Sequence, residues 1–108
     1  MNADSVFMGI DAGTTKLKLM LYDAQMKELG SSSRDTKIYI PENGASEIDM
    51  DELWASLCEA AQELKQNYPE KMAHLVGLGI SGQGDGLWPL DQDGRPACRA
   101  ILWNDSRS

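Results

Sequence analysis

The fold is decided by residues 6–22, which read VFMGIDAGTTKLKLMLY. Residues 6–10 form a short apolar run, and after residues 11–15 apolar and polar side chains alternate from residue 16 to residue 22. Strands with one buried face show this period-two alternation, and a Gly-containing connection between two such runs is typical of a β-hairpin. We therefore expect two antiparallel strands at the start of a sheet.

The next segments predict a third strand and one long helix. Residues 28–40 are rich in Ser and carry β-branched residues towards their end, which predicts a strand in this segment. Asp49 precedes Glu52 by three residues, as a helix N-cap precedes its reciprocal partner. Apolar residues then recur at spacings of three and four as far as Tyr68, and Pro69 ends this helical pattern.

Three further stretches predict strands. Residues 75–80 form a continuous apolar run, which is typical of a strand covered on both faces. Residues 87–90 and 97–102 predict two shorter strands around a turn at Asp93 and Gly94. The predicted order is three strands, one helix, one strand, a loop and two strands, which defines an α/β fold.

The composition limits the classes of function. The chain has 108 residues, with 10 Lys and Arg against 17 Asp and Glu, and a formal net charge of −7. This length allows one domain at most. The negative charge argues against binding to nucleic acid or to an anionic membrane, because both need clustered Lys and Arg. No apolar run approaches the roughly 20 residues that cross a bilayer, and no secretory signal opens the chain, so we expect a cytoplasmic protein.

The cysteines and the histidine do not show the pattern of a metal site. Cys58 and Cys98 lack the spacing of metal ligands, and we expect both to be buried free thiols. His74 is the only histidine, so a surface or capping role is expected for it rather than catalysis.

The first motif that carries chemistry is the connection between the two predicted hairpin strands. Asp11 can hold Mg²⁺ directly or through water, and Gly13 lets backbone N–H groups approach an oxyanion. Thr14 and Thr15 add hydroxyl donors, and Lys18 can supply a positive charge from the same part of the sheet. These are the parts of a phosphate cradle. The alternative is a tight turn with Gly13 at positive φ and Thr side chains as turn donors.

The second motif is the glycine-rich stretch at residues 82–86, directly after the predicted strand at 75–80. Open α/β sheets bind ligands at this end of their strands. Alternating glycines let a ligand approach the backbone, while Gln83 and Asp85 project hydrogen-bonding groups. The alternative is a glycine-rich turn with a solvated Asp85.

The third motif is Trp103-Asn104-Asp105-Ser106-Arg107, which again follows an apolar run. An indole face packs against the C–H face of a sugar, and the neighbouring amide and carboxylate can bind its hydroxyls. The alternative is core packing by Trp103 with a surface ion pair between Asp105 and Arg107.

In their order along the chain, these motifs resemble the start of the FGGY carbohydrate kinases, the family of glycerol kinase and xylulokinase. The resemblance runs from about Met8 to Arg107. It is carried by residues 9–15, by residues 46–49 with Trp54, by residues 79–83 and by residues 100–107. It implies an actin-like ATPase fold, also called ribonuclease H-like, with a mixed sheet of βββαβ order. It further implies that residues 1–108 are the first part of an N-terminal sugar-binding domain, without the catalytic aspartate region and the C-terminal domain.

The resemblance assigns the first motif to nucleotide phosphates. Asp11 matches the family's Mg-phosphate aspartate and is the expected metal ligand. Gly13 lies in the phosphate loop, Thr14 and Thr15 match its hydroxyls, and Lys18 falls on a position that is arginine in glycerol kinase. The implied cofactors are ATP and Mg²⁺.

The other two motifs are assigned to the substrate. Gly84 and Asp85 fall on a pair that reads Arg-Glu in glycerol kinase and Met-His in xylulokinase, and the present pair is closer to erythritol and L-xylulose kinase-like members. Trp103 falls on the tryptophan that lines the glycerol site. With Gln83 and Asp105, these residues form the expected substrate-binding set.

The expected function is therefore ATP-dependent phosphorylation of a hydroxyl on a pentulose, tetritol or similar sugar or polyol. The catalytic base is expected after Ser108, so residues 1–108 alone should be inactive. Uncovered apolar surface should make this chain self-associate, so a homo-oligomer is one expected form. Two alternatives remain at this point: the nucleotide-binding domain of another actin-like ATPase, and a non-catalytic interaction domain.

Overall fold

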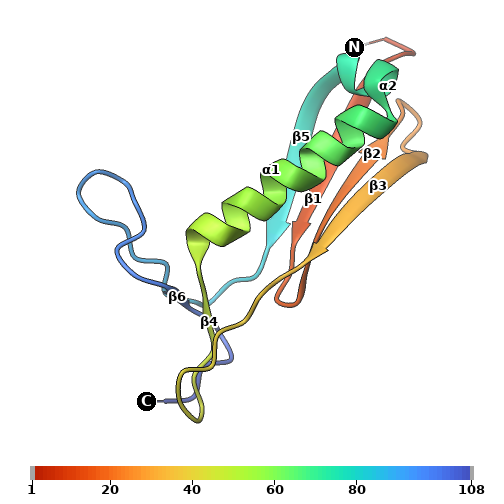
Figure 1. Cartoon of the computed structure of the whole chain (residues 1–108). Helices are drawn as coiled ribbons and strands as arrows, with labels where there is room; N and C mark the ends of the chain where they lie inside the picture. Colours follow the sequence, from red (N-terminus) through yellow and green to blue (C-terminus); the bar gives the residue numbers. More distant parts are fainter. Residues whose placement is uncertain (1, 108) are drawn as a thin grey trace.

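The computed structural model describes residues 2–107 and shows a mixed four-stranded sheet with a long helix on one face (Figure 1). The strands follow the order β3-β2-β1-β5, in which β1 pairs antiparallel with β2 and parallel with β5. Their bounds are β1 Val6–Ala12, β2 Lys16–Tyr22, β3 Glu28–Asp35 and β5 Leu75–Gly82. The predicted hairpin and the βββαβ order are confirmed.

The long helix begins where its N-cap predicts. Helix α1 spans Met50–Asn67, and the Asp49 carboxylate accepts a hydrogen bond from the Glu52 backbone N–H at 3.0 Å. The reciprocal contact is not the one expected, because the Glu52 carboxylate accepts from the Tyr39 hydroxyl at 2.6 Å. A short helix α2, Pro69–Ala73, follows α1, and His74 forms its exposed C-cap.

The core lies between α1 and the adjacent face of the sheet. The alternation predicted for β2 places Leu17, Leu19 and Leu21 inward, each no more than 1% exposed. Each such side chain contributes about 1.5–3 kcal/mol through burial. The buried cluster also includes residues from β1 and α1, namely Val6, Met8, Ile10, Ala60 and Leu64.

Strand β3 consists mostly of small or polar residues, and this lets α1 pack closely on it. The buried Ser32 hydroxyl donates to the Ala60 carbonyl of α1 at 2.7 Å. A Cβ built on Gly30 would overlap the ring of Tyr68, at the end of the helix. The predicted strand segment of residues 28–40 is therefore only partly correct, since its β-branched end leaves the sheet and makes a single bridge from Tyr39 to Glu47.

Strand β5 corrects one prediction. A strand covered on both faces was expected at residues 75–80, but β5 is an edge strand, and Val76, Leu78 and Ile80 are 59%, 57% and 70% exposed. The reason is the position of α1, which packs on β2 and β3 and leaves the adjacent part of β5 uncovered (Figure 1). An apolar groove of about 310 Å³ remains between Ile80 and Trp54 of α1.

A second, two-stranded sheet lies beyond the N-terminal end of α1. It pairs β4, Glu47–Ile48, with β6, Ala100–Ile101, in antiparallel register. Of the two short strands predicted at residues 87–90 and 97–102, only β6 forms, and the rest makes isolated bridges from Leu87 to Ile101 and from Leu90 to Pro96. Residues 88–99, the projecting loop, extend away from the main sheet (Figure 1). The molecule is accordingly elongated, with extents of 51 × 28 × 23 Å.

The cysteine prediction is half correct. Both thiols are free, but Cys58 is only partly buried and Cys98 is exposed in the projecting loop. Cys98 was expected inside a strand, but it lies in the projecting loop that takes the place of that strand, where its side chain is exposed. Within residues 2–107, no helix is long and apolar enough to cross a membrane.

Candidate functional site

The first motif lies at the end of β1, on the sheet face opposite α1. Asp11 is the direct register partner of Lys18 on β2, so their side chains share one face. Both residues are exposed. Because the neighbouring Ile10 and Leu17 point into the core, the alternation of the two strands sends Asp11 and Lys18 to the open side. A carboxylate and an ammonium group thus flank the hairpin connection.

The hairpin connection is held by its backbone. The Gly13 N–H donates to the Lys16 carbonyl at 3.1 Å, and a Cβ on Gly13 would lie 3.2 Å from that same oxygen. Gly13 is not at positive φ, so the alternative of a left-handed glycine turn is wrong. A side chain at this position would crowd the Lys16 carbonyl, so the glycine eases the close approach of the two backbone segments. The Thr15 carbonyl accepts from the Thr36 N–H at 2.9 Å, and the Thr15 side chain is left at the surface.

A chain of hydrogen bonds joins the three sequence motifs. The Trp103 indole Nε1–H donates to the Thr14 hydroxyl at 3.0 Å, and that hydroxyl donates to the Gln83 side-chain oxygen at 3.4 Å. Thr14 comes from the hairpin, Gln83 from the end of β5 and Trp103 from the segment after β6. Three segments far apart in the sequence therefore converge on one hydroxyl group.

Asp85 occupies a strained backbone position. Its φ of 59° lies in the left-handed region, which Asp tolerates better than most residues. A Cβ on the next residue, Gly86, would lie 2.8 Å from Trp88 Nε1 and 2.9 Å from the Ile101 carbonyl, so a side chain is excluded there. A Cβ on Gly84 would meet nothing within 4 Å. The loop thus displays Asp85 between two residues without side chains.

Asp85 and Trp103 line one cavity, which we call the β6 cavity. It has a volume of about 880 Å³ and lies along β6, between residues 85–87, Glu47 of β4 and residues 98–107. Trp103 is 56% exposed, so part of its ring is available for contact. The cavity is open, and both apolar and charged side chains line it.

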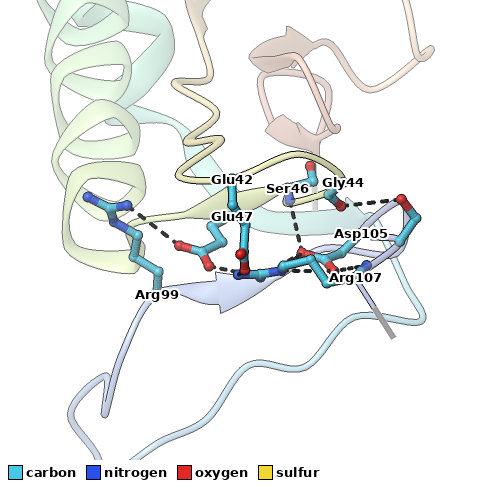
Figure 2. A network of polar contacts seen from close by, with 8 residues as sticks. Glu42, Gly44, Ser46, Glu47, Arg99, Asp105 and Arg107 are labelled. Carbon is cyan, nitrogen blue, oxygen red and sulfur yellow. Dashed lines mark hydrogen bonds and ion pairs between the residues drawn. The ribbon is translucent and has the colours of Figure 1, made fainter.

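Figure 2 shows the charged network along this cavity. The Asp105 carboxylate accepts from the Ser46 N–H at 2.9 Å and pairs with the Arg107 guanidinium at 2.6 Å. Arg107 also contacts Glu47 at 2.8 Å and Glu42 at 3.4 Å. These contacts join the segment after β6 to the segment before α1. The Asp105 side chain is only 8% exposed.

The pKa values of the pair follow from these contacts. Hydrogen bonds from the Arg107 guanidinium and from the Ser46 N–H lower the pKa of Asp105 to about 2. The Asp105 hydrogen bond raises the pKa of Arg107 above its usual value. Asp105 is therefore a charged, internally bonded group, and the ion pair that the sequence offered as an alternative at this position does form.

The network continues to Tyr39. The Arg99 guanidinium contacts Glu47 at 3.5 Å and lies over the Tyr39 ring at 3.6 Å from its centroid. Lys37 lies 4.6 Å from the same centroid. No sequence motif marks Glu47 or Arg99 as a cavity residue. The only available signal was the acidic stretch before the helix, which indicated a helix entry rather than a partner for arginine.

The predicted residues thus fall into two groups. Asp85, Trp103 and Asp105 line the β6 cavity, and Gln83 reaches it through Thr14. Gly84 lies exposed beside Asp85. The second group flanks or forms the hairpin connection and does not line that cavity. It consists of Asp11, Gly13, Thr15 and Lys18. The two groups meet at Thr14.

The residues at the hairpin fit a metal ion that is bound to a nucleotide's phosphates better than a metal ion coordinated by protein side chains alone. Within residues 2–107, no three His, Cys, Asp or Glu side chains gather as metal ligands. Mg²⁺ bound to a nucleotide needs only one or two protein carboxylates, because phosphates and water complete its coordination. The exposed Asp11 carboxylate satisfies this requirement.

The family is shown by comparison with known proteins. The model for the N-terminal domain of the FGGY family of carbohydrate kinases matches residues 6–108, and the chain belongs to this family. A probable L-xylulose kinase of Pasteurella multocida is 33% identical over 102 residues, covering 94% of this chain and 21% of that protein. The L-xylulose/3-keto-L-gulonate kinase of Escherichia coli is 35% identical, covering 94% and 20%.

Solved structures of carbohydrate kinases superpose on this fold. A xyloylose kinase from Brucella ovis superposes with a TM-score of 0.91 at 30% identity, covering 94% of this chain and 22% of that chain. A gluconate kinase from Lactobacillus acidophilus gives a TM-score of 0.84 at 27% identity, covering 94% and 20%. The predicted fold is thereby confirmed. The chain spans about a fifth of the length of these relatives.

Proposed function

We propose that this chain is the first part of the sugar-binding domain of an ATP-dependent carbohydrate kinase that phosphorylates a hydroxyl of a sugar or polyol. Membership of the FGGY family supports the reaction class. The observation that carries the proposal is the contact of the Trp103 indole with Thr14, which joins the β6 cavity to the hairpin. A phosphate group and an acceptor hydroxyl must come together in phosphoryl transfer, and this contact brings their two proposed sites together.

Each proposed site has a defined chemical task. The Gly13 region and the Thr15 hydroxyl would donate hydrogen bonds to phosphate oxygens, and Lys18 would add positive charge. Thr14 would donate to phosphate only by exchanging its long 3.4 Å bond to Gln83 for one to the ligand. Asp11 would hold Mg²⁺, which neutralises phosphate charge when bound. Charge that develops on the transferred phosphoryl group is stabilised best by donors already fixed in place, as the hairpin backbone is.

The β6 cavity would hold the acceptor. Asp85 can accept hydrogen bonds from substrate hydroxyls, while the exposed part of the Trp103 ring can pack on C–H groups. In the proposed reaction a carboxylate takes the proton of the attacking hydroxyl, and we assign that carboxylate to a part of the parent protein after residue 108. Gln83 would keep Thr14 in place rather than contact the substrate.

A substrate screen tests the proposal. The parent-length protein that carries this chain is incubated with ATP, Mg²⁺ and a panel of pentuloses, tetritols, pentitols and glycerol, and ADP release is measured. We expect turnover with at least one member of the panel and none with residues 1–108 alone, because one partial domain cannot enclose both substrates. Absence of turnover across the panel would contradict the proposal, as would sugar-dependent ADP release by the short chain.

We further propose a cytoplasmic enzyme and a self-associating short chain. The cytoplasmic location is supported by the family and its use of ATP. Self-association is supported by the uncovered apolar strand β5.

A further inference from the structure

We propose that Trp103 is a positioning residue for phosphoryl transfer, whose indole N–H fixes the direction in which the Thr14 hydroxyl offers its proton to a bound phosphate. This inference rests on the proposed function, because it concerns how the phosphate part of the same site is held. Three segments of the chain meet at this hydroxyl, and their contacts determine which way its proton points.

The Thr14 hydroxyl has one proton and two lone pairs, so its contact with Trp103 decides how it is used. An indole N–H can only donate, and Trp103 Nε1 lies 3.0 Å from Thr14 Oγ1. Thr14 therefore turns a lone pair towards the indole and sends its proton in another direction. The rotation of the hydroxyl is thereby restricted before any ligand binds.

Gln83 accepts this proton in the ligand-free molecule. Its side-chain oxygen lies 3.4 Å from Thr14 Oγ1, which is long for a hydrogen bond between two oxygens. Phosphate oxygens are charged and accept hydrogen bonds more strongly than an amide oxygen does. A phosphate at the hairpin connection would therefore take the place of Gln83 as the acceptor at little cost, while the hydrogen bond from Trp103 stays in place.

Both partners of this hydroxyl are anchored by other contacts. The Gln83 backbone N–H donates to the Ala12 carbonyl at 3.2 Å, which ties the end of β5 to the hairpin. Directly before Trp103, Leu102 is buried, and its N–H donates to the Ser46 carbonyl at 2.9 Å. The fold therefore holds the indole in advance, as it must hold a donor that orients another group.

The oriented hydroxyl lies where the proposed phosphate site needs a donor. Thr14 is partly buried in the hairpin connection, and a Cβ on the preceding Gly13 would lie 3.8 Å from Asp11 Oδ1. The carboxylate proposed to hold Mg²⁺ and the hydroxyl thus lie on either side of one glycine. Because Trp103 is 56% exposed, its hydrogen bond adds little to stability, and its loss should affect phosphate binding and turnover rather than melting.

The test is a double-mutant cycle in the parent-length protein. Trp103→Phe keeps an aromatic ring and removes the N–H, Thr14→Val keeps the side-chain shape and removes the hydroxyl, and the two changes are also combined. Thr14→Ser retains the hydroxyl and should preserve the wild-type behaviour. Trp54→Phe is the matched control, because Trp54 lies on α1 and its indole makes no hydrogen bond within residues 2–107.

Two measurements do not depend on turnover. Calorimetry gives the affinity for the Mg²⁺ complex of AMP-PNP, an ATP analogue that resists transfer. NMR of protein that carries isotopically labelled tryptophan gives the indole N–H signal of Trp103, which is the signal that Trp103→Phe removes. In the ligand-free protein this signal should move in Thr14→Val and stay near its wild-type position in Thr14→Ser. The constants kcat and KM are then measured with the best acceptor of the substrate panel.

Trp103→Phe should weaken AMP-PNP binding and lower kcat, each by about three- to tenfold, the range expected for the loss of one neutral hydrogen bond. Thr14→Val should lower kcat by about 100-fold, because a donor to the transferred phosphate is lost. In the Thr14→Val background, Trp103→Phe should change kcat by less than about twofold, since the group through which it acts is gone. The smaller ring can raise the acceptor KM, but equally in both backgrounds. Trp54→Phe should change none of these constants.

The outcomes separate this inference from the proposed function. Equal losses of kcat on Trp103→Phe in both backgrounds would overturn the inference and leave the kinase function in place. An indole signal that Thr14→Val does not move would overturn it as well. Coupled losses of AMP-PNP binding in a protein without turnover on any acceptor would support the positioning role and contradict the proposed reaction. Absence of AMP-PNP binding in the wild type would contradict both.

Discussion

At the scale of single residues, Asp11 can be separated from the stability of the fold. Its carboxylate is exposed, and it makes no hydrogen bond or ion pair within residues 2–107. In the parent-length protein, Asp11→Asn should therefore lower kcat by about 100-fold or more, through loss of the proposed Mg-phosphate contact, with little change in melting temperature. Kinetic assays and thermal unfolding measure the two effects. A lower melting temperature with retained turnover would identify Asp11 as a residue of the turn.

For Asp105 we expect an effect on the stability of the fold, because its carboxylate is hydrogen-bonded within the molecule. Its pKa of about 2 in the folded state lies below the ordinary value of 3.8. The unfolded state therefore binds more protons between these values, and the stability that Asp105 contributes is present above about pH 4 and is lost as the pH falls towards 2. The Asp105→Asn variant should show a shallower loss of stability over this window.

Denaturant unfolding of residues 1–108 at several pH values between 2 and 6 measures this slope. Asp93→Asn is the matched control, since its side chain is exposed in the projecting loop and makes no ion pair within residues 2–107. Equal slopes in wild type and Asp105→Asn would show that the contacts with Arg107 and Ser46 do not persist in solution.

At the scale of elements, the packing of α1 on β3 depends on a missing side chain. A Cβ at Gly30 would overlap the Tyr68 ring, so Gly30→Ala must displace this ring from its place against the core, or move the end of the helix with it. We expect a loss of about 1–3 kcal/mol in the free energy of unfolding, as for other overpacked sites. Gly79→Ala is the control on β5, where a Cβ would meet nothing within 4 Å. Similar stabilities of the two variants, measured by denaturant unfolding, would contradict this packing.

The predictable elements are those fixed by neighbours in the sequence. The hairpin followed from alternation in residues 16–22, and the start of α1 followed from Asp49, whose bond to Glu52 spans three residues. The residue at which β3 ends and the exposure of β5 could not be predicted from such local patterns. A strand that faces a helix backbone can use Ser and Gly, and an apolar run looks the same whether or not another layer covers it.

The residues of the candidate site likewise divide into those that a local motif predicts and those that depend on tertiary contacts. Asp11, Asp85 and Trp103 could be chosen from local motifs. The contact between Trp103 and Thr14 joins residues 89 positions apart, so no local pattern contains it. Glu47 and Arg99 were missed for the same reason, because each becomes a cavity residue only when β4 pairs with β6.

At the scale of the whole molecule, the uncovered strand β5 predicts self-association of residues 1–108. Its exposed side chains Val76, Leu78 and Ile80 lie on an edge strand that carries no charge. Such an edge pairs readily with another chain. Light scattering during gel filtration should therefore detect oligomers that grow with concentration, and Ile80→Lys should shift the population towards monomer.

Leu90→Lys is the control for this prediction. Leu90 is 60% exposed, but it lies in the projecting loop and not on the sheet edge. A wild-type chain that stays monomeric and melts cooperatively would contradict the prediction, and so would an equal effect of the two substitutions.

The separation of the β6 cavity from the hydrophobic core has an evolutionary consequence. A Cβ on Gly84 would meet nothing within 4 Å, whereas Gly86 is constrained by Trp88 and the Ile101 carbonyl, and Asp85 by its positive φ. Mutations at residue 84 can therefore accumulate at little cost to folding, whereas the positive φ at residue 85 favours Asp, Asn and Gly. We expect a duplicated gene to change this rim of the cavity within that narrow set while its scaffold is inherited unchanged. A laboratory library confined to these two codons would follow the same route.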